Sequence, residues 1–250
     1  MFMRKSTFAG ILIASFSILT FLQSCKNDKN LLVSPPVPDQ SFAEEFDTLD
    51  AAYNRGWRFI NRSVVTGRRS WQNPSFLIPF TSYSGKNIGY LWTDYQSTAS
   101  TSGTISNWAI SPSITLQNGD KIIFYTRGEL IPYSGLHKDF VNRMQVRINT
   151  SNTLNCGNGT DHGDFTILLL DVNPFYYEFI LEAFNNPADP LYKNTKLAYP
   201  HVWTRFEATV TGLNKPVIGN FAFRYFTELA GSTGRATSIG IDKVSYIGKH

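Results

Sequence analysis

Three aromatic residues, Trp92, Tyr95 and Tyr133, have side chains that are suited to binding a sugar. A flat aromatic ring packs on the apolar face of a sugar, while carboxylates and amides hydrogen-bond its hydroxyls. Trp92 and Tyr95 adjoin the Ser/Thr-rich stretch 97–104, where we expect a loop, and Tyr133 stands near turn residues. The alternative is that aromatic residues pack the core, as we expect of Trp57, Trp108 and Trp203.

Three acids, Glu45, Asp47 and Asp242, are candidate metal ligands. Ca²⁺ takes 6–8 oxygen ligands from carboxylates and backbone carbonyls. If the first and last strands of the domain lie side by side, Asp47 comes close to Asp242, and Glu45 shares a strand face with Asp47. A structural calcium is therefore one hypothesis. The alternatives are that Asp47 accepts backbone hydrogen bonds without a metal, or that a buried arginine such as Arg224 pairs with it.

The sequence lacks the common catalytic motifs. There is no G-x-S-x-G motif, and Gly231-Ser232-Thr233-Gly234 has the wrong spacing and is typical of a hairpin tip. The four His residues show no H-E-x-x-H spacing. A pair of carboxylates for glycoside hydrolysis remains open, since any β-sandwich has acids. We therefore expect no enzyme activity, with a hydrolase as the third alternative.

The N-terminus has the pattern of an export signal. Arg4 and Lys5 precede an uncharged, mostly apolar stretch from Phe8 to Leu22, which is short for a membrane span. The sequence Leu-Gln-Ser-Cys that ends at Cys25 resembles a bacterial lipobox. This resemblance implies cleavage before Cys25, lipidation of its thiol and anchoring in the outer membrane. The alternative is an ordinary secreted protein with Cys25 near the cleavage site by chance.

The stretch 25–41 is expected to be a tether between this lipidated cysteine and the domain. It contains three prolines and no periodicity. Its start, Lys-Asn-Asp-Lys, resembles the surface-export signals of Bacteroidetes lipoproteins. Removal of residues 1–24 takes two of the 23 basic residues and no acid, which leaves 21 against 19 acidic residues, or +2. This weak, scattered charge argues against nucleic acid as a partner.

From Phe42 onward the chain shows many short strands separated by turns. The composition, with 17% charged residues, 18 Gly and 12 Pro, excludes collagen and low-complexity disorder. The patterns predict an all-β sandwich or jelly roll over 42–250. A short helix is expected over 175–184, inside an insertion spanning 173–200. The strands are expected at 57–65, 105–110, 121–127, 144–148, 165–172 (buried on both faces), 203–210, 221–226 and 239–247.

Several of these segments resemble one known family. Phe42-Ala43-Glu44-Glu45-Phe46-Asp47 and the later Trp57, Asn107-Trp108-Ala109-Ile110-Ser111-Pro112, and Ile239-Gly240-Ile241-Asp242-Lys243-Val244 are similar to motifs of choice-of-anchor J domains. Those domains are related to cleaved-adhesin modules and, more distantly, to MAM-type domains. The resemblance spans about 42–248 and implies a jelly-roll β-sandwich of two antiparallel sheets. Lys243 stands where the family usually has a second acid, which departs from its metal pattern.

Together these observations favour a cell-surface lipoprotein with a non-catalytic binding domain. The first hypothesis for its ligand is an extracellular glycan, bound through Trp92, Tyr95 and Tyr133. The alternative is a surface protein, which would make the domain an adhesion module. Family members serve as surface binding or adhesion modules, so the resemblance implies either partner.

Overall fold

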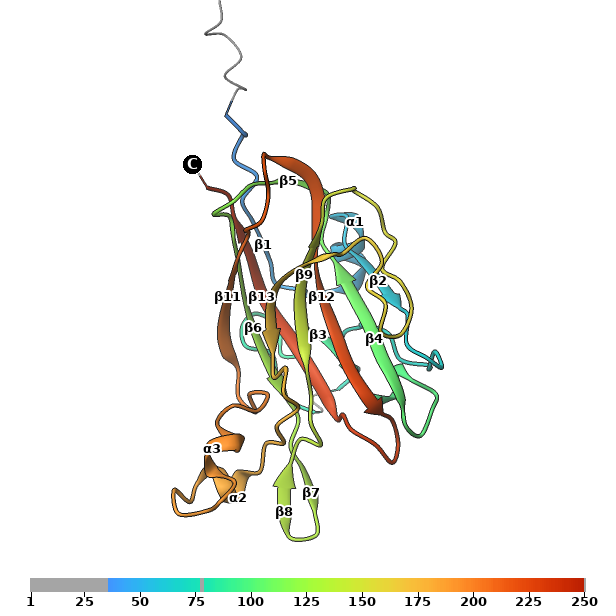
Figure 1. The fold of residues 1–250 in the computed structure, drawn as a ribbon, viewed down its shortest axis with the longest axis vertical. Coiled ribbons are helices and arrows are strands. Elements are labelled where there is room, and N and C mark those ends of the chain that lie inside the picture. Colours follow the sequence, from blue (N-terminus) through green and yellow to red (C-terminus); the bar gives the residue numbers. More distant parts are fainter. Residues whose placement is uncertain (1–35, 77–78, 250) are drawn as a thin grey trace, which may run out of the picture. The chain divides into compact units, whose positions relative to one another are not determined.

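The domain is a sandwich of two antiparallel β-sheets, as the sequence predicts (Figure 1). The computed structural model describes residues 36–76 and 79–249. The first sheet has the order β1-β13-β6-β11, with β3 also paired to β13. Its strands are β1 (Phe42–Glu44), β3 (Leu91–Asp94), β6 (Lys121–Gly128), β11 (Thr204–Thr209) and β13 (Ser238–Ile247).

The second sheet has the order β10-β9-β12-β4-β2, with β5 also paired to β12. Its strands are β2 (Arg58–Asn61), β4 (Gly103–Ile110), β5 (Ile114–Leu116), β9 (Met144–Asn149), β10 (Ile167–Val172) and β12 (Val217–Ala230). A separate hairpin joins β7 (Ile131–Tyr133) to β8 (Leu136–Lys138). The short helices are α1 (Leu49–Asn54), the 3₁₀ turn η1 (Tyr95–Ser97), α2 (Leu181–Phe184) and α3 (Tyr192–Thr195).

The core lies between the facing sides of the two sheets. Strand β6 shows why: Ile122 and Phe124 alternate with less buried residues and point inward, because successive side chains of a strand leave opposite faces. Phe221 and Phe223 of β12 meet them from the other sheet, and Trp57 stacks on Phe223. Trp57 and Trp108 are both fully buried, Trp57 in this core and Trp108 in a second buried cluster on the outer face of the second sheet.

The first and last strands of the domain lie side by side, as predicted. Strands β1 and β13 are antiparallel neighbours, with Glu44 opposite Val244. Glu44 is buried and accepts two hydrogen bonds from Arg55 at the end of α1. The start of the domain is therefore held both by the sheet and by this ion pair.

Chain segments outside the strands cover the outer face of each sheet. On the first sheet, residues 79–90 pack against Gly240, and Phe80 meets Trp203 edge to face. Trp203 is therefore on an outer face, and the prediction that it fills the core is wrong. On the second sheet, Cys156 and Phe165 of the loop between β9 and β10 form a small cluster with Trp108, Ile110 and Ala222 of the strands.

The predicted helix over 175–184 is shorter than expected. Only α2, at Leu181–Phe184, is helical in that range. The side chain of Asn173 accepts a hydrogen bond from Tyr177 N at 2.8 Å and donates to Tyr177 O, which fixes a turn there. Phe179 N donates to the carboxylate of Asp139 instead of a helical carbonyl. Side chains thus take over the backbone groups that a helix needs.

Strand β10 differs from the prediction in its burial. Its continuous apolar sequence suggested a strand buried on both faces, but β10 is an edge strand of the second sheet and Leu168 is 44% exposed.

Among the described residues, helices long and apolar enough to span a bilayer do not occur.

Candidate functional site

One pocket contains all three aromatic residues that the sequence suggested for ligand contact. Trp92, Tyr95 and Tyr133 line a cavity of about 580 Å³, which we call the aromatic pocket. This volume falls within the roughly 300–1,000 Å³ of typical small-ligand sites. Tyr133 is 54% exposed, and Trp92 and Tyr95 are partly buried. The other lining residues are Asp94, Glu129, Ile131, Phe140, Gly231, Ser232, Thr233, Gly234, Ala236 and Thr237.

Trp92 lies in a strand, β3, which is missing from the strands that the sequence predicts. In β3, Leu91 and Thr93 are fully buried, while Trp92 and Asp94 point to the outer face of the first sheet. The alternation of the sequence Leu-Trp-Thr-Asp is the signal that could have identified this strand. Strand pairing places Trp92 opposite Gly240.

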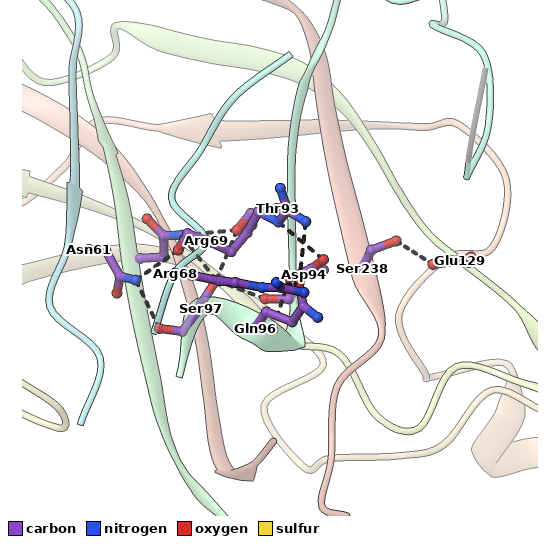
Figure 2. Close-up of polar contacts among 10 residues, drawn as sticks. Asn61, Arg68, Arg69, Thr93, Asp94, Gln96, Ser97, Glu129 and Ser238 are labelled. Atoms are coloured by element: carbon purple, nitrogen blue, oxygen red, sulfur yellow. Dashed lines mark hydrogen bonds and ion pairs between the residues drawn. The ribbon is translucent and has the colours of Figure 1, made fainter. Parts of the chain in front are cut away.

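Asp94, an acid of the pocket lining, contacts Gln96 and Arg69 (Figure 2). Its Oδ1 accepts a hydrogen bond from Gln96 N at 2.8 Å and caps η1, and its Oδ2 pairs with Arg69 Nε at 3.2 Å. Arg69 also stacks on the Trp92 ring, 4.5 Å from its centroid. One face of the indole is therefore covered by protein. Burial raises the pKa of Asp94, and Arg69 opposes that rise.

Glu129 is the second acid of the pocket. Its Oε2 accepts a hydrogen bond from Ser238 Oγ at 2.7 Å (Figure 2). Its backbone N–H donates to Ser238 O. Ser238 pairs with Asp94 across β13 and β3, so the two acids flank Ser238. Two strand spacings put their backbones about 10 Å apart. Burial raises the pKa of Glu129, and the nearby charge of Asp94 raises it further.

Several pocket residues escaped the sequence analysis. Gly231-Ser232-Thr233-Gly234, which we took as a hairpin tip, connects β12 to β13 and forms one side of the pocket. Glu129 and Phe140 carried no sequence signal, because neither stands in a motif. Asp94 stands between Trp92 and Tyr95, and this adjacency is the one clue that the sequence offered.

The predicted metal ligands Glu45, Asp47 and Asp242 converge on one short segment, residues 83–86. Asp242 Oδ2 accepts hydrogen bonds from Tyr83 N at 2.7 Å and Ser84 N at 3.1 Å. Asp47 Oδ1 accepts from Lys86 N at 3.3 Å, and Glu45 Oε2 accepts from Ser84 Oγ at 2.6 Å. The three carboxylates thus hold this segment onto the sheet.

The geometry of these carboxylates does not form a metal cluster. Within residues 36–76 and 79–249, no group of three or more His, Cys, Asp or Glu side chains is arranged to hold a metal ion. Their oxygens accept N–H and O–H donors, the arrangement expected without a metal. Burial raises the pKa of Asp242 to about 7, although three backbone N–H donors lower it. A structural calcium here remains a prediction.

The predicted lipidation site falls in a part of the chain that the structure does not describe. Residues 1–35 contain the predicted signal peptide, Cys25 and most of the predicted tether. Residues 36–41 precede β1 and form neither helix nor strand. The lipid anchor therefore remains a prediction.

The chain resembles several solved structures of β-sandwich modules. The K1 cleaved adhesin domain of Lys-gingipain from Porphyromonas gingivalis is 17% identical, covering 84% of this chain and 99% of that one, with a TM-score of 0.47. The K2 cleaved adhesin domain of Lys-gingipain is 16% identical, with 84% and 99% coverage and a TM-score of 0.46. The CBM22-1 xylan-binding domain of Paenibacillus barcinonensis Xyn10C is 12% identical, with 82% and 92% coverage and a TM-score of 0.36. No protein-family profile and no curated protein matches this chain. Cleaved adhesin domains, which the sequence motifs resemble, thus stand among its structural neighbours.

Proposed function

We propose that this protein is a non-catalytic binding module whose aromatic pocket holds an uncharged sugar unit of an extracellular glycan. The observation that carries the proposal is the gathering of Trp92, Tyr95 and Tyr133 around one cavity together with Asp94 and Glu129. Aromatic rings supply apolar faces, and the carboxylates accept hydrogen bonds from sugar hydroxyls. This combination of an apolar lining and a few polar groups is typical of small-ligand sites.

The charge of the pocket supports an uncharged sugar. Its lining includes the acids Asp94 and Glu129 and no basic residue, and the neighbouring Lys138, 4.2 Å from the Phe140 ring, is paired with Glu178 at 3.1 Å. Asp94 is already paired with Arg69, whereas within residues 36–76 and 79–249 the Glu129 carboxylate accepts a hydrogen bond only from the Ser238 hydroxyl. A uronic acid or sulfated sugar would bring a like charge to a partly buried carboxylate, which is unfavourable.

The test is a panel of immobilised polysaccharides probed with the full chain in detergent. We expect binding to a neutral glycan and none to polygalacturonate. Tyr95→Ala and Tyr133→Ala should each weaken binding about tenfold or more, which corresponds to about 1.4 kcal/mol. Phe175→Ala is the matched control, since Phe175 is 76% exposed and lies outside the pocket. The proposal would be refuted if the protein bound no polysaccharide of the panel, or if Tyr95→Ala and Tyr133→Ala bound as tightly as the wild type.

A protein-binding adhesion module is the second candidate function. Val64, Val65 and Leu229 are 51%, 63% and 58% exposed and line a shallow hollow of about 590 Å³. Exposed apolar patches of this kind mark interaction sites in other proteins. Paired substitution of Val64 and Leu229 by Ser should then abolish binding to a surface protein and leave glycan binding unchanged.

A glycan-active hydrolase is the third candidate, because the pocket contains two acids with raised pKa values. Inverting glycosidases place their carboxyl groups about 6.5–9.5 Å apart. Here Asp94 has both oxygens engaged, by Arg69 and by the backbone of η1, which supports a binding role. Release of reducing ends from any bound polysaccharide, lost in Glu129→Gln, would overturn the non-catalytic proposal.

We also propose that the protein is anchored to the outer membrane by lipid on Cys25 and faces the cell surface. The Leu-Gln-Ser-Cys sequence and the apolar stretch before it support this proposal. Cys25→Ala should move the protein from the membrane fraction to the soluble fraction. Cys156→Ala serves as the control, because Cys156 is a buried thiol in the domain. Retention of the Cys25 variant in membranes would contradict the anchor.

A further inference from the structure

A second hollow adjoins the aromatic pocket. It has a volume of about 330 Å³, and Tyr95 and Ser232 line both cavities. Arg68, Gln96 and Ala99 line only the second. The two cavities therefore meet along a shared boundary formed by an aromatic ring from η1 and a residue of the β12–β13 connection.

This boundary is held in place by the backbone. Tyr95 N donates to Thr237 O at 2.7 Å, which ties the start of η1 to the start of β13. The Asp94 carboxylate accepts from Gln96 N and caps the same turn. Ser232 is exposed on the other side. Tyr95 is thus fixed at the position where a ligand leaving one cavity enters the other.

The two cavities differ in charge. The aromatic pocket includes two acids, whereas the second hollow includes Arg68 and no acid. Arg68 is exposed and donates through Nε to Gln96 Oε1 at 3.0 Å. A guanidinium has five N–H donors, so Arg68 can also donate to the oxygens of a ligand. The aromatic pocket therefore presents carboxylate acceptors, and the second hollow presents guanidinium donors. Sugar hydroxyls can donate to the carboxylates and accept from the guanidinium.

We infer that the ligand is an internal stretch of a linear glycan that runs from the aromatic pocket, across Tyr95 and Ser232, into the second hollow. This inference rests on the proposed function and adds the requirement for at least two joined sugars. A second sugar that is covalently joined to the first binds at a high effective concentration, so the chain binds more tightly than either unit alone.

The experiment measures binding of neutral gluco-, xylo- and manno-oligosaccharides, from one to six sugars, to the full chain by calorimetry. In a series that binds, we expect affinity to rise about tenfold or more from one sugar to three. Ala99→Trp places an indole in the second hollow and should remove this gain while monosaccharide binding stays unchanged. Arg68→Ala should weaken binding of the trisaccharide and not of the monosaccharide. Ala188→Trp is the matched control, since Ala188 is exposed in the insertion.

The outcomes separate the inference from the function on which it rests. Equal affinity for one and three sugars, or a length dependence that survives Ala99→Trp, would overturn the inference and leave glycan binding intact. Loss of monosaccharide binding in Ala99→Trp would also count against it, because the two cavities would then not act as separate sites. Absence of binding by the wild-type chain, to these series and to the polysaccharide panel alike, would overturn the proposed function itself.

Discussion

Arg224 is a buried cation that has no carboxylate partner among the described residues. It is 1% exposed and donates to Ser106 Oγ, Gln145 Oε1 and the carbonyl oxygens of Gly159 and Asp161. The hypothesis that it pairs with Asp47 is therefore wrong. Burial lowers the pKa of Arg224 to about 9, so the guanidinium stays protonated at neutral pH. Its hydrogen bonds hold the β9–β10 loop on the second sheet.

Replacing Arg224 should therefore loosen that loop. We expect Arg224→Met to lower the free energy of unfolding by about 2–4 kcal/mol, because the buried Gly159 carbonyl, the Asp161 carbonyl and the Ser106 hydroxyl lose their donor. The thiol of Cys156, which belongs to the same loop and is 1% exposed, should then react faster with a thiol reagent. Urea unfolding and labelling rates measure the two effects.

The control for this substitution is Arg205→Met. Arg205 is an exposed residue paired with Glu207 at 2.7 Å, and its loss should change the unfolding free energy by about 0.5 kcal/mol or less. An Arg224 variant as stable as the wild type, with unchanged Cys156 labelling, would show that the loop is held by other contacts.

Carboxylates attach the segment 79–90 to the first sheet. Asp242 accepts hydrogen bonds from Tyr83 N and Ser84 N, and the Tyr83 ring stacks on Tyr125 of β6 at 3.7 Å between centroids. Gly240 is required beneath it, because a Cβ there would come within 2.7 Å of the Phe80 ring. This segment is therefore held on the sheet by three acids (Glu45, Asp47 and Asp242), by stacked rings and by one glycine.

Asp242→Asn should lower the melting temperature in EDTA, because an amide nitrogen would face backbone N–H donors. A loss of about 1–3 kcal/mol corresponds to a fall of roughly 2–12 °C. If calcium binds Glu45, Asp47 and Asp242, the fall should be larger in calcium than in EDTA. Equal falls in both conditions would remove the calcium hypothesis. Asp50→Asn, an exposed acid in α1, provides the control.

At the scale of the whole molecule, stability should depend on pH through buried carboxyl groups. Burial raises the pKa of Asp139 to about 7, with backbone donors from Val141, Phe179 and Asn142 opposing the rise. Burial also raises the pKa of Asp242 to about 7. Between about pH 4 and pH 7 the folded state then binds more protons than the unfolded state, so stability falls as the pH rises through that window.

We therefore expect a higher melting temperature at pH 5 than at pH 8, with a difference of several degrees. Asp139→Asn should reduce this difference, because one of the two groups no longer titrates. Burial lowers the pKa of His201, so below about pH 6.5 the unfolded state binds more protons at this residue and stability falls as the pH falls. This contribution opposes that of the two carboxyl groups and should make the gain in melting temperature at acid pH smaller. A melting temperature that rises steadily from pH 5 to pH 8 would contradict this prediction.

The sequence by itself determined the class of fold and most strand positions. Alternation of apolar and polar residues is a local property, so segments such as 121–127 and 144–148 fall on β6 and β9 within one residue. The helical insertion was located, but its helix was overestimated. The side chains of Asn173 and Asp139 accept hydrogen bonds from Tyr177 N and Phe179 N, which a helix would need. Asp139 lies 40 positions before Phe179 in the chain, so local sequence patterns do not reveal this contact.

Only the tertiary structure decided the site. The aromatic pocket combines residues from β3, η1, the β6–β7 region and the β12–β13 connection, which are distant in sequence. Sequence types alone suggested Trp92, Tyr95 and Tyr133, because exposed aromatic rings near turns have a recognisable chemistry. Glu129 becomes a candidate ligand-binding acid because it is partly buried beside Ser238, and this burial raises its pKa. Such burial depends on distant segments of the chain that pack around the residue. Propensity and periodicity act between neighbours in the chain, whereas a pocket and its charges depend on neighbours in space.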